Sequence, residues 1–375
     1  MDVRDWERAG LYNPDEPHAS ERLALLQYLT DRGATLEQMV EAHEVRSLPG
    51  LAGDLVTQGR DELVPLSEIS ARSGMSVPRV MRAMLAAGIP VTPESRVPAN
   101  LVTLMTAFEA GSALMGDDAI LAFTRVLGAS AINIAEAAVA LFWAEYGPGS
   151  VKEGPDELAR AELSEAATRA FLAVPEVMAQ AVLDQFERAQ RRAQAVRGWS
   201  DPSADGGPGG PTEVVALGFV DLVGSTAWAQ TLDFREQSLA LTRFESSAWS
   251  SAVLAGGRVV KTIGDAVFFA APNAEAACRI GTEVCRAAGE DAVLPPARGA
   301  VGIGAVTPRE GDYYGPLVNL LSRLVKVGEP GELVVTGEAA ADLPADRWSL
   351  RELEPVALPG IEGTVQVFVV APLPA

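Results

Sequence analysis

The chain has 375 residues, roughly two to three times the length of a typical single domain, which predicts two domains that each bury a core. A hydrophobic fraction of 48% with 21% charged residues excludes a disordered or fibrous chain. The 50 acidic and 30 basic residues give a net charge of −20, which disfavours broad electrostatic binding to nucleic acid or anionic membranes.

The first residues and the two cysteines indicate a reducing compartment. The first residues, MDVRDWERAG, lack the apolar stretch of a secretory signal peptide, so we expect a cytoplasmic protein. The two cysteines, Cys278 and Cys285, are spaced so that they share one face of a predicted helix. They are therefore expected to be buried free thiols, with no disulfide framework.

The region before residue 201 is predicted to be all helical, because apolar residues recur at a spacing of three to four. The expected helices cover residues 21–31, 36–45, 66–73, 77–87 and 101–110, followed by alanine-rich segments that extend to Val196. The most apolar tract, residues 119–143, is interrupted by Arg125, Asn133 and Glu136. We expect a buried pair of helices there and no transmembrane segment.

One part of this region matches the outline of a helix-turn-helix motif. The segment LSEISARSGMSVPRVMRAMLAAGIP, residues 66–90, predicts two helices around a glycine turn, and the second helix carries Arg79 and Arg82. A DNA-binding regulator, with the second domain as a nucleotide sensor, is therefore one alternative. Acidic residues outnumber basic ones in the first 212 residues, so a plain helical hairpin without nucleic-acid binding is the preferred interpretation.

The clearest domain boundary is the segment DPSADGGPGGP, residues 201–211, whose glycines and prolines sustain neither helix nor strand. We expect a helical domain over residues 1–200, a linker over 201–211 and a second domain over 212–375. The segment before the linker, residues 177–196, is either a solvated helix end or the element that couples the two domains. Its apolar residues are Val182, Leu183 and Phe186, and its basic end carries Arg188, Arg191, Arg192 and the following Arg197.

After residue 212, short apolar runs alternate with helical stretches, which is typical of an α+β or α/β domain with a central sheet. The run VVALGFVDLVGST ends at Asp221, before a Gly-Ser-Thr turn, and the run GGRVVKTIGDAVFFAA forms a predicted hairpin with Asp265 at its bend. Either aspartate alone is also common as a plain turn residue. Together, two carboxylates at strand ends are suited to hold divalent cations and a polyphosphate.

A third motif, GDYYGPLVNLLSRLVKVGEPGELVVT, places Asn319 and Arg323 four residues apart and therefore on one face of a helix. A surface polar pair is the simplest interpretation. The functional interpretation is an amide that orients a sugar and a guanidinium that meets the charge developing on a phosphoryl group.

Together the three motifs resemble the catalytic domain of the class III nucleotidyl cyclases. FVDLVGST is similar to the family's first metal motif, KTIGDAVF to its second and GDYYGPLVNLLSR to its transition-state motif. The resemblance covers nearly all of residues 212–370 and implies a ferredoxin-like α+β domain with a central, mainly antiparallel sheet. It also implies that Asp221 and Asp265 bind two divalent cations, Mg²⁺ or Mn²⁺. Asn319 would position the ribose, and Arg323 would stabilise the pentacoordinate phosphorus.

The choice of base follows from hydrogen-bond polarity, since adenine offers an amino donor and an N1 acceptor whereas guanine has the opposite pattern. Lys261 can donate to N1 and Asp312 can accept from the amino group, and both match the family's adenine-reading positions. The resemblance therefore implies an adenylyl cyclase that makes cyclic AMP from ATP, with a guanylyl cyclase as the alternative. A snorkelling lysine and a turn aspartate are the non-functional interpretations of these two residues.

Three positions depart from the family pattern. The run that starts at Arg298 places the arginine earlier than usual and has Gly304 instead of the family's histidine, which leaves the role of Arg298 open. Ser322 stands where alanine is more common.

In the family, the metal residues come from one subunit and the base-reading and transition-state residues from the other. The resemblance therefore implies a homodimer with two equivalent sites.

The helical first domain resembles, more distantly, that of actinobacterial cyclases of a pH-responsive type, in which it inhibits the catalytic pair and can bind a fatty acid. This implies an autoinhibited signalling enzyme, regulated by pH or by a lipid. Residues 101–142 are rich in Ala, Leu and Met and could line an apolar pocket, although a packed core explains them as well. The histidines, His18 and His43, lie near the N-terminus, so pH sensing would involve carboxylate or arginine clusters.

Overall fold

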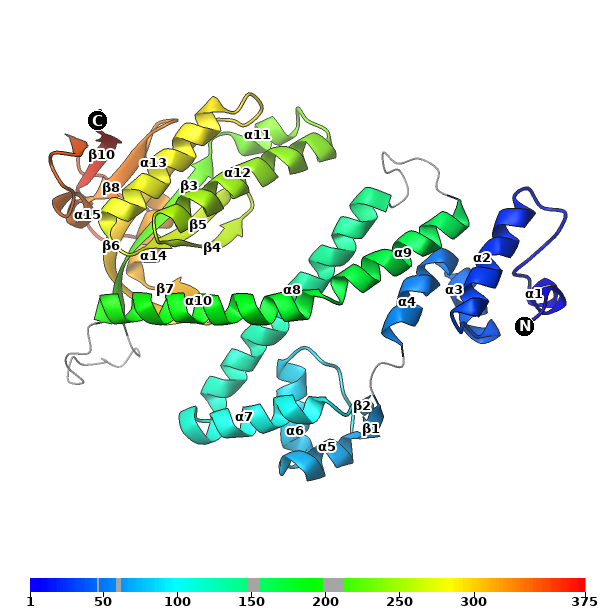
Figure 1. Cartoon of the computed structure of the whole chain (residues 1–375). Coiled ribbons are helices and arrows are strands. Elements are labelled where there is room, and N and C mark those ends of the chain that lie inside the picture. Colours follow the sequence, from blue (N-terminus) through cyan, green and yellow to red (C-terminus); the bar gives the residue numbers. More distant parts are fainter. Residues whose placement is uncertain (46, 59–61, 147–155, 198–211, 375) are drawn as a thin grey trace. The chain divides into compact units, whose positions relative to one another are not determined.

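The computed structural model describes residues 1–45, 47–58, 62–146, 156–197 and 212–374. The chain divides into two compact units, Met1–Gln185 and Phe186–Ala375, which are coloured from blue to green and from green to red in Figure 1. The division falls within helix α10 (Val174–Arg197). The predicted linker, residues 201–211, lies outside the described residues, so the domain boundary expected there stays a prediction.

The first unit is mainly helical. Its helices are α1 (Val3–Arg8), α2 (Ala19–Asp31), α3 (Leu36–Glu44), the 3₁₀ helix η1 (Leu48–Gly50), α4 (Leu51–Thr57), α5 (Leu66–Ser73), α6 (Val77–Ala86), α7 (Leu101–Met115), α8 (Asp117–Tyr146), α9 (Glu157–Phe171) and the first part of α10. Two short strands, β1 (Leu63–Pro65) and β2 (Arg96–Pro98), pair antiparallel. The predicted helical character of the first domain is confirmed, and this short strand pair is an addition to it. Each strand buries a single valine, which is too little alternation to be recognised in a sequence.

Two hydrophobic cores stabilise the first unit. One includes Leu25, Leu26, Leu29, Met39 and Ala161 and joins α2, α3 and α9. The other includes Leu66, Ile69, Met84, Met105 and Phe108 and joins α5, α6 and α7. Because each core is built from apolar residues three or four positions apart on amphipathic helices, the helical period of the sequence predicts them well.

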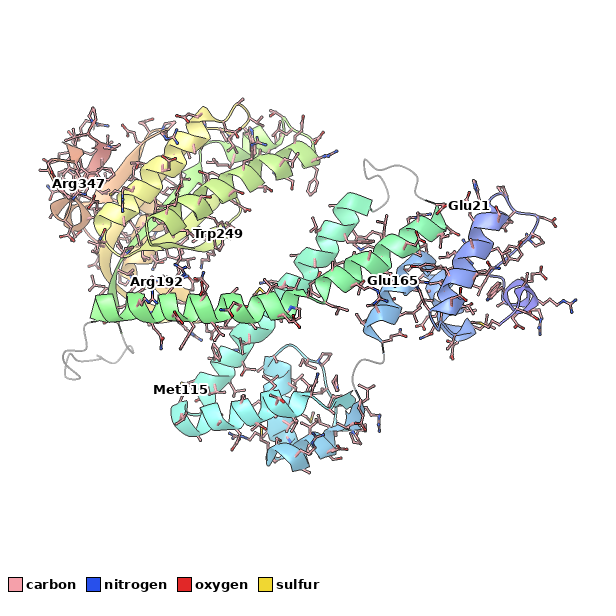
Figure 2. All side chains as sticks on the ribbon, in the orientation of Figure 1. Glu21, Met115, Glu165, Arg192, Trp249 and Arg347 are labelled. Atoms are coloured by element: carbon pink, nitrogen blue, oxygen red, sulfur yellow. The ribbon has the colours of Figure 1, made fainter. Side chains whose placement is uncertain are left out.

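A buried carboxylate fastens α9 to α2. Glu165, labelled in Figure 2, is 8% exposed and lies within reach of three donors. It accepts hydrogen bonds from the Tyr28 hydroxyl at 2.7 Å, from Arg32, and from Arg169 at 2.9 Å. Burial alone would raise the pKa of Glu165, but the three hydrogen bonds outweigh burial and lower it to about 2. The carboxylate is therefore ionised and paired near neutral pH.

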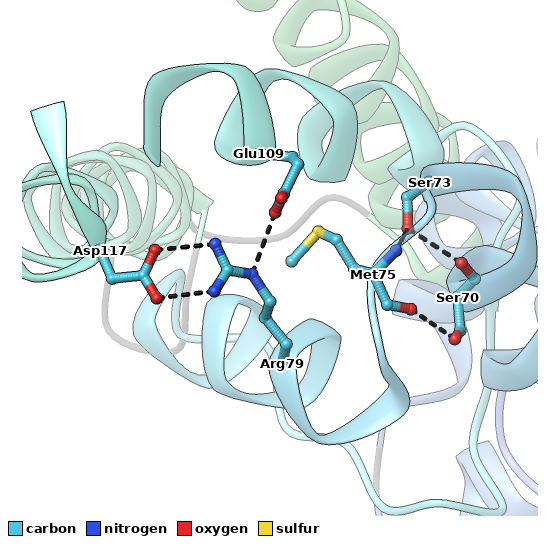
Figure 3. Close-up of polar contacts among 6 residues, drawn as sticks. All are labelled: Ser70, Ser73, Met75, Arg79, Glu109 and Asp117. Carbon is cyan, nitrogen blue, oxygen red and sulfur yellow. Dashed lines mark hydrogen bonds and ion pairs between the residues drawn. The ribbon is translucent and has the colours of Figure 1, made fainter. Parts of the chain in front are cut away.

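The helix-turn-helix outline is present as α5 and α6 around Gly74, which has a φ of +75°. Figure 3 shows that the guanidinium of Arg79, on the second helix, is occupied by two carboxylates. It donates to both oxygens of Asp117, at 2.6 and 2.7 Å, and to Glu109 at 3.0 Å. One of the two arginines proposed for DNA contact is thus engaged within the unit.

The tract expected as a buried pair of helices is one continuous helix, α8, and most of it is exposed. Within Asp117–Ala144 the buried side chains are confined to the first part, at Ile120, Leu121 and Thr124. Phe123, Leu141 and Trp143 are all more than half exposed. The helix continues through Gly128. The missing side chain of this glycine allows α8 to lie against the backbone of Ala87, since a Cβ would come within 2.5 Å of that backbone.

Two stretches, Asp117–Ala144 and Glu157–Arg192, are long and apolar enough to cross a membrane by length and composition alone. Core helices of soluble proteins pass the same test, so this is weak evidence. The cytoplasmic location stays a prediction.

The second unit contains an eight-stranded sheet with the main order β4-β5-β3-β6-β8-β10-β9, and β7 pairs with β6. The strands are β3 (Glu213–Leu222), β4 (Arg258–Ile263), β5 (Ala266–Ala271), β6 (Ala297–Arg309), β7 (Asp312–Tyr314), β8 (Leu333–Thr336), β9 (Trp348–Glu352) and β10 (Val367–Pro372). The helices are α11 (Ser225–Ala229), α12 (Phe234–Leu254), α13 (Ala274–Glu290), α14 (Pro316–Leu324), α15 (Gly337–Ala341) and the end of α10. Among the described strands of this sheet, the β6–β8 pair alone is parallel, so the predicted α+β class with a mainly antiparallel sheet is confirmed.

The two faces of this sheet carry separate cores. Successive residues of a strand point to opposite faces, so Ala216 and Val220 of β3 pack with α12 and α13, whereas Leu217 and Phe219 pack with α14. Cys278 and Cys285 lie on α13 as buried free thiols, as predicted. Burial raises the pKa of each thiol to about 12, which makes both inert as nucleophiles.

Candidate active site

Asp221 and Asp265 lie close together where two paired strands meet. Asp221 is opposite Ala266 of β5, and Asp265 stands directly before β5, after Gly264 with its φ of +64°. The backbone N–H of Leu222 donates to the carbonyl oxygen of Asp265 at 3.3 Å. Burial, together with the nearby charge of Asp265, raises the pKa of Asp221. A divalent cation would relieve this repulsion between like charges.

Arg298 lies directly across the sheet from Asp221, because β3 and β6 pair these two residues in register. Its Nη2 is 3.8 Å from Oδ2 of Asp221, and its Nη1 donates to the carbonyl oxygen of Lys326 at 3.1 Å. The Nε–H is buried and has no hydrogen-bond partner among the described residues. The positive charges of Arg298 and Lys326 both act to lower the pKa of Asp221, against the effect of burial. The arginine whose role the sequence left open is thus a counter-ion of Asp221.

Lys261 and Asp312 form an ion pair. Lys261 comes from β4, with its side chain 45% exposed, and Asp312 begins β7. The Lys261 Nζ also lies 5.8 Å from the ring centroid of Phe268. Next to this pair, Arg258 donates to the carbonyl oxygen of Gly311 at 2.9 Å. This second contact helps to hold the turn between β6 and β7 against β4.

Asn319 and Arg323 both project from α14, as their spacing predicts. Leu317, Leu321 and Leu324 bury the opposite side of this helix against the sheet, which leaves Asn319 exposed. The guanidinium of Arg323 donates through Nη1 to the carbonyl oxygen of Pro359. This contact ties the helix to the connection between β9 and β10.

The predicted site residues form three groups on one face of the sheet. Asp221 shares the face of Leu217 and Phe219, because alternate residues of β3 point the same way, and Lys261 lies opposite Phe268 on that same face. The rings of Phe219 and Phe268 stack at 4.5 Å between the two positions. Within the part of the chain that the structure describes, no hydrogen bond or ion pair joins one group to another.

No protein-family model matches this chain. The uncharacterized protein Rv2212 of Mycobacterium tuberculosis is 30% identical over 375 residues, which cover 98% of this chain and 94% of that protein. The pH-sensitive adenylate cyclase MT1302 of M. tuberculosis is 26% identical over 364 residues, 93% of this chain and 87% of that protein. An adenylate cyclase of Glutamicibacter nicotianae is 36% identical over 154 residues, 41% of this chain and 38% of that protein.

The chain belongs to the class III adenylyl cyclase family. Catalysis in this family depends in general on divalent cations, so the donors that this cyclase offers are informative. The described residues contain no cluster of three or more His, Cys, Asp or Glu side chains, which leaves Asp221 and Asp265 as a pair. Hard oxygen donors suit Mg²⁺ and Mn²⁺, and Mg²⁺ is usually bound by one or two carboxylates together with substrate phosphates. The pair therefore fits cations that are also bound by a nucleotide.

Sequence reasoning missed two features of the cyclase site. The pairing of Arg298 with Asp221 depends on the register between β3 and β6, and no local pattern reports such a register. The second is the backbone carbonyl of Pro359, which holds Arg323 and has no side-chain signature. The only available signal was the glycine-rich sequence LPGIEG around it, which predicts a turn.

Proposed function

We propose that this cyclase converts ATP to 3′,5′-cyclic AMP and pyrophosphate at a site shared by two copies of the chain. In this reaction the ribose 3′-oxygen forms a bond to the α-phosphorus, and the bond from that phosphorus to the bridging oxygen of pyrophosphate breaks. The hydroxyl proton is released to solvent. The observation that carries the proposal is the placement of Asp221, Lys261 and α14 on one sheet face of a family member.

The proposed metal ligands are Asp221 and Asp265, which would hold two divalent cations, Mg²⁺ or Mn²⁺. When bound, these cations supply Lewis acidity for the ribose hydroxyl and neutralise the triphosphate. Asn319, exposed on α14, would hydrogen-bond the ribose. Arg323 follows one turn later and keeps N–H groups free for the charge that develops on the α-phosphoryl oxygens.

The preference for adenine rests on Lys261 and Asp312. The ion pair between them brings a donor and an acceptor to one place, which matches N1 and the amino group of adenine. Guanine has the opposite pattern and would leave both groups without a partner. A site with such groups discriminates strongly against a substrate that cannot pair with them.

Two observations support a shared site. The metal, base and transition-state groups make no direct polar contact with one another within one described chain, and Lys261 and Asn319 are both exposed. A second copy packed head to tail would bring complementary groups together and create two equivalent sites.

The first unit is proposed to inhibit the catalytic unit, with pH or a bound lipid as the signal. Support comes from the similarity to a pH-sensitive relative, which extends over both units. Helix α10 belongs partly to each unit, so it is the proposed coupling element. Within the second unit, burial and the positive charge of Arg258 lower the pKa of Arg192, which indicates that the basic end of α10 lies near β4.

The deciding experiment measures cyclic nucleotide formation from ATP and from GTP, with Mn²⁺, by four proteins. These are the intact chain, residues 186–375, residues 212–375 and the intact Asp265→Ala variant. We expect ATP-specific turnover by the intact chain, and its loss by a factor of about 10³ or more in the variant, because one of two metal carboxylates is removed. Residues 212–375 should turn over faster than the intact chain, while residues 186–375 test whether the end of α10 alone inhibits.

The outcomes separate the parts of the proposal. Equal turnover of ATP and GTP would contradict the roles of Lys261 and Asp312, and GTP-specific turnover would indicate a guanylyl cyclase. No turnover in any wild-type form, with the dimer confirmed by light scattering, would leave a nucleotide-binding regulator. Identical specific activity and pH profile in the intact and shortened proteins would contradict inhibition by the first unit.

A further inference from the structure

The guanidinium of Arg323 is held by the turn that follows Leu358. Its Nη1 donates to the carbonyl oxygen of Pro359, and this is its only hydrogen bond within the described residues. The turn comes from the connection between β9 and β10, far along the chain from α14. A long side chain on a helix surface would otherwise sample several rotamers, so one fixed acceptor selects among them.

The turn is itself well anchored, so its carbonyl is a fixed point. Leu358 is 8% exposed and packs into the same core as α14, and the N–H of Ile361 donates to its carbonyl oxygen at 3.1 Å. Val356 and Val365 close the base of the connection with two backbone hydrogen bonds of 2.9 Å. The acceptor of Arg323 is therefore an exposed carbonyl on a turn that Leu358 anchors to the core.

Gly360 leaves the space that the guanidinium occupies. A Cβ at this position would lie 3.0 Å from Nη1, 3.4 Å from Nη2 and 3.6 Å from Cζ of Arg323. Gly360 also has a φ of +69°, a conformation that favours glycine. Gly363, in the same connection, has a similar φ of +78°, but a Cβ there would meet nothing within 4 Å. The two glycines share a backbone requirement and differ in contact with Arg323.

We propose that the turn formed by Leu358, Pro359 and Gly360 is a positioning element for Arg323 in the cyclase reaction. A guanidinium has five N–H donors, so the bond to Pro359 leaves others for a phosphoryl group. Stabilisation of a transition state depends on donors that are already in place before charge develops. The turn acts only through Arg323, and the inference rests on the proposed catalytic role of that residue.

The test compares Gly360→Ala with Gly363→Ala in the full-length protein, measuring kcat and KM for ATP together with the melting temperature. Both variants place alanine at a positive φ and should lose similar thermal stability. Only Gly360→Ala should lower kcat, by about 10- to 100-fold, because a shift of about an ångström in a catalytic group has an effect of this size. Its KM should change by less than about twofold, since the contact acts in the transition state.

Arg323→Ala, alone and combined with Gly360→Ala, identifies the route of the effect. We expect Gly360→Ala to lower kcat no further once Arg323 is absent. An equal fall in kcat for the Gly360 and Gly363 variants, or a full Gly360 effect without Arg323, would overturn the proposal. Wild-type kcat in Arg323→Ala would instead contradict the proposed function. If the alanine variants do not fold, Gly360→Asn and Gly363→Asn repeat the comparison, because asparagine tolerates a positive φ better.

Discussion

The two faces of the eight-stranded sheet both carry apolar strand residues, but different elements pack on them. On one face, α12 and α13 pack alanines and other apolar side chains such as Phe244 and Ala277 onto β3 and β5. The other face has α14 over part of its apolar residues, and it also carries Asp221, Arg298 and Lys261. We infer that the face covered by α12 and α13 contributes most of the stability of this unit. The opposite face holds charged groups that are only partly buried.

The largest expected effect tests the stabilising face. Phe244 on α12 is 2% exposed, so Phe244→Ala should lower the free energy of unfolding by about 3–5 kcal/mol, through lost burial and the cavity left behind. The kcat of the protein that remains folded should stay within about twofold of wild type, because the proposed catalytic residues lie on the other face. Urea denaturation would measure the free energy of unfolding, and the rate of cyclic AMP formation divided by the concentration of folded protein would measure kcat.

Phe234→Ala is the matched control, since Phe234 belongs to the same helix and is 87% exposed. Its unfolding free energy should change by less than about 0.5 kcal/mol. If Phe244→Ala changed kcat while leaving stability intact, the division of labour between the two faces would be wrong.

The sequence predicted those parts of the site that are local. Asp221 and Asp265 are next to apolar strands, and Asn319 and Arg323 follow the helical period, so short-range patterns predicted their local placement. The resemblance to a family added their roles. Contacts between distant segments could not be read in this way, and the pairing of Arg298 with Asp221 is the clearest case.

The continuity of α8 could not be predicted for a related reason. A glycine and several polar residues within an apolar tract favour a break between helices. In the structure Gly128 instead permits close approach to Ala87, so the residue serves packing between α6 and α8. The expected pair of helices is therefore replaced by one continuous helix that packs closely against Ala87.

The next effect tests the other face of the sheet at Lys261 and Asp312, the residues proposed to read the base. Asp312→Asn keeps the size of the side chain but replaces a charged acceptor by an amide that also donates. We expect the ratio of kcat/KM for ATP to that for GTP to fall by about 10- to 100-fold, the range for loss of one specific base contact. Stability should change little, because the Lys261–Asp312 pair is partly exposed.

Asp346→Asn, at an exposed position before β9, is the control for loss of one negative charge and should leave the ratio unchanged. A fall in the use of both nucleotides by the same factor would show that Asp312 supports the site without reading the base. Competition assays with both nucleotides present would measure the ratio directly.

The smallest expected effect concerns the counter-ion on the same face. Arg298 lies 3.8 Å from Asp221, where it repels a cation that approaches the carboxylate pair. Two unit charges about 4 Å apart in water interact by about 1 kcal/mol, and we expect a repulsion of this size because the cation's double charge is offset by its greater distance, beyond the carboxylate. Arg298→Gln should therefore raise the affinity of the nucleotide-free protein for Mn²⁺ by about fivefold in a calorimetric titration. The difference should shrink at high salt, which screens the removed charge.

Arg309→Gln is the control, since Arg309 ends the same strand and its side chain is 69% exposed. An equal rise in Mn²⁺ affinity in both variants would mean that overall charge, and not the position of Arg298, governs metal binding. Weaker Mn²⁺ binding in Arg298→Gln alone would mean that the arginine holds Asp221 in a binding geometry. In that case, the orientation that Arg298 gives to Asp221 would favour metal binding more than the positive charge of Arg298 opposes it.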